Sequence, residues 1–244
     1  ADAFPELARA LLEAGEEEQA LAVCESVPAS AMIPLARAGR AAGRKAAAAS
    51  LLERAVAAAP GDRAVLLAAA REWMALGRPE DALRRLEDAV ARAPRDAELW
   101  LRIGLARRAA GGSADGQALA AFLRAADADP EARAPLLEAC REHLARGDAA
   151  AAAALLRRAL SLGAEDPDTL RIAVSLLHAT GDSAAALRLA ERVRAAAPEA
   201  WWAYDMAVSL LAEAGRWREA HTVLEAWEAR NGPCRNRNAT SCHH

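Results

Sequence analysis

Aromatic residues, lysine, asparagine and long apolar runs are all scarce in this sequence of 244 residues. Aromatics make up only 4% of it, and alanine supplies most of the 54% hydrophobic share. Alanine has the highest intrinsic helix propensity, and few segments alternate apolar and polar residues as a strand would. The composition therefore predicts an all-α protein.

The charge balance and the short apolar runs argue against two kinds of partner. The formal net charge is -3 and the isoelectric point is near 6.0, whereas a general nucleic-acid binder is usually strongly basic. No apolar run in the sequence approaches the roughly 20 residues that a bilayer-spanning helix requires. We therefore expect no nucleic-acid partner and no membrane span.

One short pattern recurs along the chain: a Gly, an Ala five residues later, a large apolar residue, an Ala or Val, and often a Pro. Its clearest copy runs from Gly77 to Pro94, with Ala82, Leu86 and Ala89 between them. Seven copies follow one another in phase. They cover residues 1–28, 29–62, 63–96, 97–132, 133–166, 167–200 and 201–234.

Each copy predicts a pair of amphipathic helices. The Gly ends the first helix, where a left-handed residue is needed, and the Pro stops the second. The Ala is small because the two helices cross closely there. One such pair cannot bury its apolar face alone, so the pairs must stack on one another to form a core.

This spacing resembles the tetratricopeptide repeat (TPR) family, whose repeat of about 34 residues has the same Gly, Ala and Pro positions. The resemblance covers residues 1–232 and leaves residues 233–244 as a separate C-terminal tail. It implies a right-handed α-solenoid of stacked helix-turn-helix repeats. The fourth repeat has two extra residues within 111–116, at the turn between its helices, where an insertion costs least.

The resemblance further implies that the first helix of each repeat lines a concave groove, through repeat positions near 2, 5, 6, 9, 12 and 13. Arginines occupy many of these positions, namely Arg9, Arg37, Arg40, Arg71, Arg102, Arg108, Arg141 and Arg171. Because a guanidinium binds a carboxylate through a bidentate fork, this stripe predicts an acidic peptide or an acidic partner surface as the ligand. The competing interpretation is that the arginines solvate an Ala-rich helix. The nearby acids that would help them are Glu6, Glu13, Glu98 and Glu138.

The family's Asn-and-Lys clamp for a C-terminal carboxylate is absent. No Asn precedes Asn231, and Lys45 is the only lysine. Any groove in this chain must therefore bind its ligand through other side chains.

The seventh repeat is unusually aromatic, with four of the six tryptophans of the chain. Trp217 lies at a position where the family tolerates an aromatic, so we expect it to pack within the repeat. Trp201, Trp202 and Trp227 are expected to contact the tail or a second subunit, with a ligand as the alternative, because large apolar groups at the end of an array need cover.

The tail contains Cys234, Cys242, His243 and His244, and three interpretations of it remain open besides a fortuitous sequence. The two cysteines form a disulfide, which requires an oxidising compartment. Alternatively they attach haem c, with His243 as the axial ligand and His244 available for the far side, although the spacer is longer than in the usual Cys-x-x-Cys-His motif. In the third interpretation, the four residues bind zinc or a similar metal, with a spacing unlike common structural sites.

These observations predict a non-catalytic scaffold that binds a protein or an acidic peptide and needs no cofactor. No Ser/His/Asp order, phosphate loop or carboxylate pair indicates an enzyme. The alternative is a structural subunit that self-associates head to tail through its terminal repeats, with haem c on the tail. Because the chain begins at Ala1 and its tail has two cysteines, we expect a secreted, periplasmic or cell-surface protein, with a cytoplasmic one as the alternative.

Overall fold

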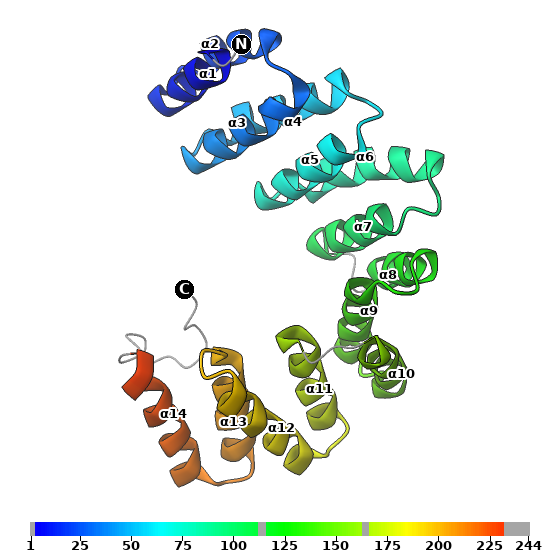
Figure 1. Ribbon diagram of the computed structural model, residues 1–244, viewed down its shortest axis with the longest axis vertical. Helices are drawn as coiled ribbons and strands as arrows, with labels where there is room; N and C mark the ends of the chain where they lie inside the picture. The colour runs from blue at the N-terminus through cyan, green and yellow to red at the C-terminus, as the bar shows by residue number, and fades with distance from the viewer. Residues whose placement is uncertain (1–2, 112–115, 163–165, 232–244) are drawn as a thin grey trace. The chain divides into compact units, whose positions relative to one another are not determined.

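The computed structural model describes residues 3–111, 116–162 and 166–231, and all regular structure in these ranges is helical, as the composition predicts (Figure 1). Fourteen α-helices and one short 3-10 helix, η1, make up this part of the chain. They are α1 (Ala3–Ala14), α2 (Glu17–Val23), η1 (Cys24–Ser26), α3 (Ala29–Ala41), α4 (Lys45–Ala58), α5 (Arg63–Ala75), α6 (Pro79–Arg92), α7 (Ala97–Ala109), α8 (Gln117–Ala128), α9 (Arg133–Ala145), α10 (Ala149–Ser161), α11 (Pro167–Ala179), α12 (Ser183–Ala196), α13 (Trp201–Glu213) and α14 (Trp217–Asn231).

The helices fall two to each predicted repeat, and the repeat glycines divide the pairs. Gly77 follows α5 with a φ of +73°, a left-handed conformation that costs a residue with a Cβ atom free energy. Pro79 then opens α6 at its first position, where its missing N–H leaves no bond unmade. The other predicted glycines also have positive φ angles, namely Gly15, Gly43, Gly111, Gly147, Gly181 and Gly215.

The two helices of a pair pack closely where the sequence places small residues. Ala82 is completely buried, and its equivalents in the other six repeats are at most 6% exposed. In the fourth pair Gly104 of α7 lies directly against the ring of Phe122 of α8. A Cβ atom added at Gly104 would lie 2.4 Å from Phe122 Cε1. The phase of the repeat therefore determines which side chains must be small.

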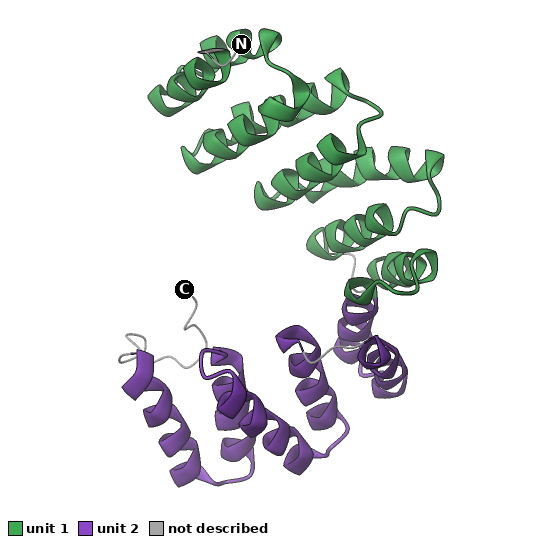
Figure 2. Cartoon of the chain, in the orientation of Figure 1, with its two compact units in different colours: residues 1–135 green, residues 136–244 purple. Residues whose placement is uncertain are grey.

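The chain divides into two compact units, residues 1–135 (unit 1) and residues 136–244 (unit 2), as Figure 2 shows. In unit 1 the first helices of the pairs contact one another in the order α1, α3, α5, α7. Its core includes the fully buried Trp73. Unit 2 has a core of its own on helices α11–α14, which includes Val174, Ala207 and Leu211. The repeat pattern does not indicate this division.

The two cysteines in helices pack as apolar groups. Cys24 and Cys140 are free thiols and are completely buried. Burial raises the pKa of the Cys140 thiol to about 11, since the thiolate would lose its hydration, and it raises the pKa of Cys24 as well. Both therefore stay neutral near pH 7 and are poor nucleophiles. None of the described helices is both long and apolar enough to cross a bilayer.

Several first helices begin at an aspartate that caps the free backbone N–H groups. Asp96 accepts hydrogen bonds from the backbone N–H groups of Glu98 and Leu99 at the start of α7. Its carboxylate also accepts from the guanidinium of Arg63 at the start of α5, with Nη2 at 3.0 Å. This ion pair joins the start of α5 to the start of α7. The hydrogen bond from Arg63, followed by the backbone bonds, holds the pKa of Asp96 below its usual value.

The lowered pKa of Asp96 predicts a pH dependence of stability. Since the folded pKa lies below the unfolded one, the ion pair stabilises the fold above about pH 4 and loses this effect as the pH falls through the folded pKa. Asp96→Asn keeps a capping side chain but removes the charge, so it should cost about 0.5 kcal/mol at pH 7 and little at pH 3. Urea unfolding at both pH values measures the difference.

The matched control for this experiment is Asp62→Asn. Asp62 caps α5 in the same way, and the described residues include no ion pair of its own. A pH-dependent loss of equal size in both variants would mean that the Arg63 pair contributes nothing.

Candidate functional site

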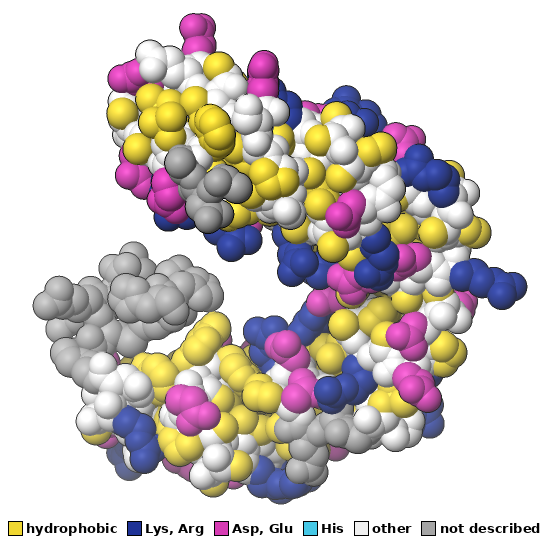
Figure 3. Space-filling model, turned by 45° about the horizontal axis from the view of Figure 1, so that its top comes forward, with side chains coloured by type: hydrophobic (Ala, Val, Ile, Leu, Met, Phe, Trp, Pro, Cys, Tyr) yellow, Lys and Arg dark blue, Asp and Glu magenta, His cyan; other side chains and the backbone are white. Residues whose placement is uncertain are grey.

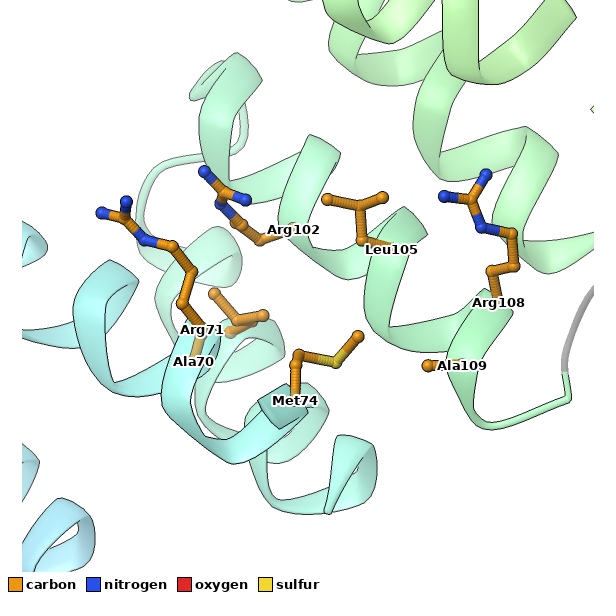
Figure 4. A pocket seen from close by; sticks show the side chains of 8 residues that line it. Ala70, Arg71, Met74, Arg102, Leu105, Arg108 and Ala109 are labelled. Carbon is orange, nitrogen blue, oxygen red and sulfur yellow. The ribbon is translucent and has the colours of Figure 1, made fainter. Parts of the chain in front are cut away.

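A pocket of about 310 Å³ opens between the first helices α5 and α7 of unit 1 (Figure 4). It is lined by Ala70, Arg71, Met74, Leu86, Arg102, Leu105, Arg108 and Ala109. Arg71 and Met74 hold positions 9 and 12 of the third repeat, and the α7 residues hold positions 6, 9, 12 and 13 of the fourth. These are the positions that the family resemblance assigns to a groove.

The pocket combines an apolar interior with a charged rim. Leu86 is completely buried beneath it, and Met74 and Leu105 are half-buried at its walls. The guanidinium groups of Arg71 and Arg102 lie on the same side of the pocket, and that of Arg108 lies at the other end beyond Leu105 (Figure 4). A ligand in this pocket would therefore contact apolar side chains in the interior and arginine side chains at the rim.

The three arginines of the rim have different surroundings. Arg71 is exposed, and its Nε is 3.4 Å from the carbonyl oxygen of Leu67, a long contact. No carboxylate within the described ranges pairs with it. Arg102 donates from Nη2 to Glu98 at 2.6 Å along the same helix. The guanidinium of Arg108 lies 5.5 Å from the centre of the Phe122 ring.

Two other arginines of the predicted stripe in unit 1 are paired with a carboxylate. Arg37 and Arg40 of α3 both point to Glu72 of α5, with Nε to carboxylate oxygen distances of 2.7 and 3.3 Å. The repeat positions did not identify Glu72 as a residue of the groove. The available signal was an acidic residue within the apolar stripe of α5, next to the buried Trp73. Arg9 is exposed on α1, and no described carboxylate pairs with it.

The two stripe arginines of unit 2, Arg141 and Arg171, are also paired with carboxylates. Arg141 of α9 bonds Glu138 one turn earlier and reaches Asp168 of α11 at 3.5 Å. Arg171 reaches the same Asp168 at 3.2 Å. The pairs of Glu138 and of Glu98 with arginine are those that the competing interpretation of the stripe predicts. On the face drawn in Figure 3, basic and acidic side chains are accordingly interspersed.

The tryptophans of the seventh repeat have different surroundings. Trp202 is buried in the core of unit 2, and Trp227 is half-buried with its ring 5.0 Å from that of Tyr204. Trp201 is 39% exposed. The prediction that Trp217 packs within the repeat is wrong, because this residue is 68% exposed. Burial of α14 starts only at Ala220, one turn after Trp217.

The tail residues Cys234, Cys242, His243 and His244 lie outside the described residues, so the disulfide, haem and metal interpretations remain predictions. Within the part of the chain that the structure describes, no three His, Cys, Asp or Glu side chains lie close enough to hold a metal ion.

Comparison with known proteins supports the same architecture. Residues 39–105 match the tetratricopeptide repeat family model, and no curated protein matches the chain. A tetratricopeptide repeat protein from Parabacteroides merdae superposes with a TM-score of 0.69 at 15% identity, over 84% of this chain and 80% of that one. A thermophilic TPR protein from Thermus thermophilus gives 0.57 at 25% identity, over 75% and 98%. PilF from Pseudomonas aeruginosa gives 0.59 at 19% identity, over 87% and 96%.

Proposed function

The chain is a tetratricopeptide repeat protein, an all-α solenoid of stacked helix pairs, and we propose that it is a non-catalytic scaffold that binds an acidic segment of a partner protein. The binding face consists of the first helices of unit 1. Binding of proteins and peptides is the general role that this fold supports. The acidic segment and its location on this face are our specific proposals.

The observation that carries the proposal is the pocket between α5 and α7. It brings Arg71, Arg102 and Arg108 together around an apolar interior, whereas Arg37 and Arg40 are already engaged by Glu72. An acidic ligand should therefore be attracted more strongly to this pocket than to Arg37 and Arg40. Arginine suits this role because its planar fork binds a carboxylate through two hydrogen bonds.

Reversal of one charge at the pocket tests the proposal. Peptides are first selected against the wild-type chain from a displayed library of random short sequences. Arg71→Glu should weaken the binding of the selected acidic peptides about tenfold at low salt, because a charge-assisted hydrogen bond is replaced by repulsion. The loss should shrink as salt screens the exposed charges. Fluorescence anisotropy measures both effects.

Arg92→Glu is the matched control for this experiment. Arg92 is exposed at the end of α6, in the same unit, and the substitution changes the net charge by the same amount. If both variants bind the selected peptides as the wild type does, the α5–α7 face is not the binding face.

Self-association is a second candidate function, favoured by exposed apolar side chains on terminal helices. Trp217 and Leu224 lie seven residues apart on one face of α14 and are 68% and 40% exposed. Phe4 and Leu7 of α1 are 48% and 49% exposed. A contact between α14 of one copy and α1 of the next would be heterologous and would build rings or filaments.

Under this second candidate, Trp217→Ser should reduce the assembly size. Sedimentation velocity over a range of protein concentrations measures it, with Leu160→Gln, at an exposed apolar position on α10, as the control. If the wild type sediments as a monomer at every concentration, this candidate is ruled out.

A further inference from the structure

We propose that the α5–α7 pocket holds one bulky apolar side chain of the bound segment, with acidic residues on both sides of it in the partner's sequence. This inference rests on the proposed function and makes it more specific. The partner motif is then a Leu, Met or Phe between carboxylates, rather than an acidic stretch alone.

The size of the pocket supports a single anchoring side chain. Its volume of about 310 Å³ is at the lower end of the range of roughly 300–1,000 Å³ that small-molecule sites span. A pocket of this size has room for one large apolar side chain. Met74 forms one wall, and its unbranched thioether adjusts to the shape of whatever enters.

The apolar walls argue against a purely acidic ligand. A carboxylate placed between Met74 and Leu105 would lose its hydration and gain no hydrogen bond from either side chain. The same walls favour binding of an apolar side chain. Leu105 and Met74 are half-buried, and a bound apolar group would remove their remaining exposed hydrocarbon from water.

The rim explains why carboxylates should flank the apolar anchor. Arg71 and Arg102 lie on the same side of the pocket, and only Arg102 has a described carboxylate partner, Glu98 (Figure 4). The pair of guanidinium groups carries two positive charges and has one described carboxylate partner, so it should attract a second anion. Arg108 places a further cation at the opposite end. An anchor with an acidic residue before and after it matches this arrangement, whereas an amphiphile with one carboxylate matches one end only.

The pairing of Arg37 and Arg40 with Glu72 makes the neighbouring part of this face less attractive to an acidic segment. Glu72 lies between α3 and α5 with Arg37 and Arg40 bound to it, so an incoming carboxylate must compete there with a buried one. No such competitor reaches Arg71 among the described residues.

The test uses three fluorescein-labelled peptides with the full chain. The first is Gly-Asp-Glu-Leu-Asp-Glu-Gly, the second has Ser in place of Leu, and the third has Asn and Gln in place of the acids. We expect the Leu peptide to bind about tenfold more tightly than either of the others, as measured by anisotropy at low salt. Dodecanoate, added as a competitor, should displace it only weakly.

Variants of the chain then assign the preference to the pocket. Leu105→Gln should weaken binding of the Leu peptide and reduce its preference over the Ser peptide. Leu160→Gln, at an exposed leucine of unit 2, should change nothing. The comparison between the Leu and Ser peptides needs no altered protein, so it remains decisive if Leu105→Gln folds poorly.

The outcomes separate this inference from the proposed function. Equal affinities for the Leu and Ser peptides, both reduced by Arg71→Glu, overturn the apolar anchor and leave the acidic-segment scaffold in place. Tighter binding of dodecanoate than of the Leu peptide also overturns it and assigns the pocket to a lipid-like ligand. If Arg71→Glu changes the affinity for none of the peptides, both the inference and the proposed binding face are wrong.

Discussion

Gly104→Ala should destabilise unit 1 by about 1–3 kcal/mol, although alanine is the better helix former by about 1 kcal/mol. The reason is the contact between α7 and α8. The new methyl group would lie 2.4 Å from Cε1 of Phe122, well inside van der Waals contact. Phe122 is completely buried and its ring is rigid, so the helices must separate to admit the methyl group. The cost of overpacking exceeds the gain in helix propensity.

Gly39→Ala is the matched control, because it makes the same chemical change inside a first helix of the same unit. A methyl group at Gly39 would lie 3.7 Å from Ala48 Cβ and from both Leu12 methyl groups, which is ordinary contact. We expect Gly39→Ala to leave stability unchanged or to raise it by up to about 1 kcal/mol. Urea unfolding followed by circular dichroism measures both variants. Similar stabilities for the two would show that α7 and α8 adjust their spacing freely.

The second large effect concerns the ion pairs at Glu72, where we expect the loss of the arginines to cost more than the loss of the carboxylate. The side chain of Glu72 is 8% exposed, whereas those of Arg37 and Arg40 are 64% and 34% exposed. Without the carboxylate, the arginines can turn to water. Without the arginines, a buried carboxylate has lost both cations and cannot easily be hydrated.

The expected sizes follow from this asymmetry. Glu72→Gln keeps the shape of the side chain and exchanges charge-assisted hydrogen bonds for neutral ones, at a cost of about 1 kcal/mol. The double variant Arg37→Gln/Arg40→Gln should cost about 2 kcal/mol or more at pH 7. Adding Glu72→Gln to the double variant should recover part of that loss, since the stranded charge is then removed. The free energies of unfolding of the three proteins give the comparison.

A double variant no less stable than Glu72→Gln would contradict this account. It would mean that Glu72 reaches water once its partners are gone. The triple variant then serves as the internal check, because it should be no more stable than the double variant in that case.

The helix pairs and their boundaries could be predicted from the sequence because they depend on local backbone chemistry. A left-handed turn needs a glycine, a close helix crossing needs an alanine, and a proline cannot continue a helix, so the positions of Gly77, Ala82 and Pro94 define one repeat. These constraints act within a single helix pair. They can be recognised without knowledge of the rest of the chain, and seven copies in phase establish the architecture. The repeat positions also identified Arg71, Arg102 and Arg108 as facing one surface.

Only the tertiary structure decided that Arg37 and Arg40 are paired with a carboxylate of another helix. Arg37 and Glu72 are separated by 35 residues and meet because α3 packs against α5. The repeat positions place both helices in the array but do not say whether an acidic side chain of one reaches a base of the other. Neighbouring helices in a solenoid also differ in where burial begins, as Trp217 on α14 demonstrates. Periodicity acts through local backbone geometry, whereas neutralisation and burial depend on contacts between helices.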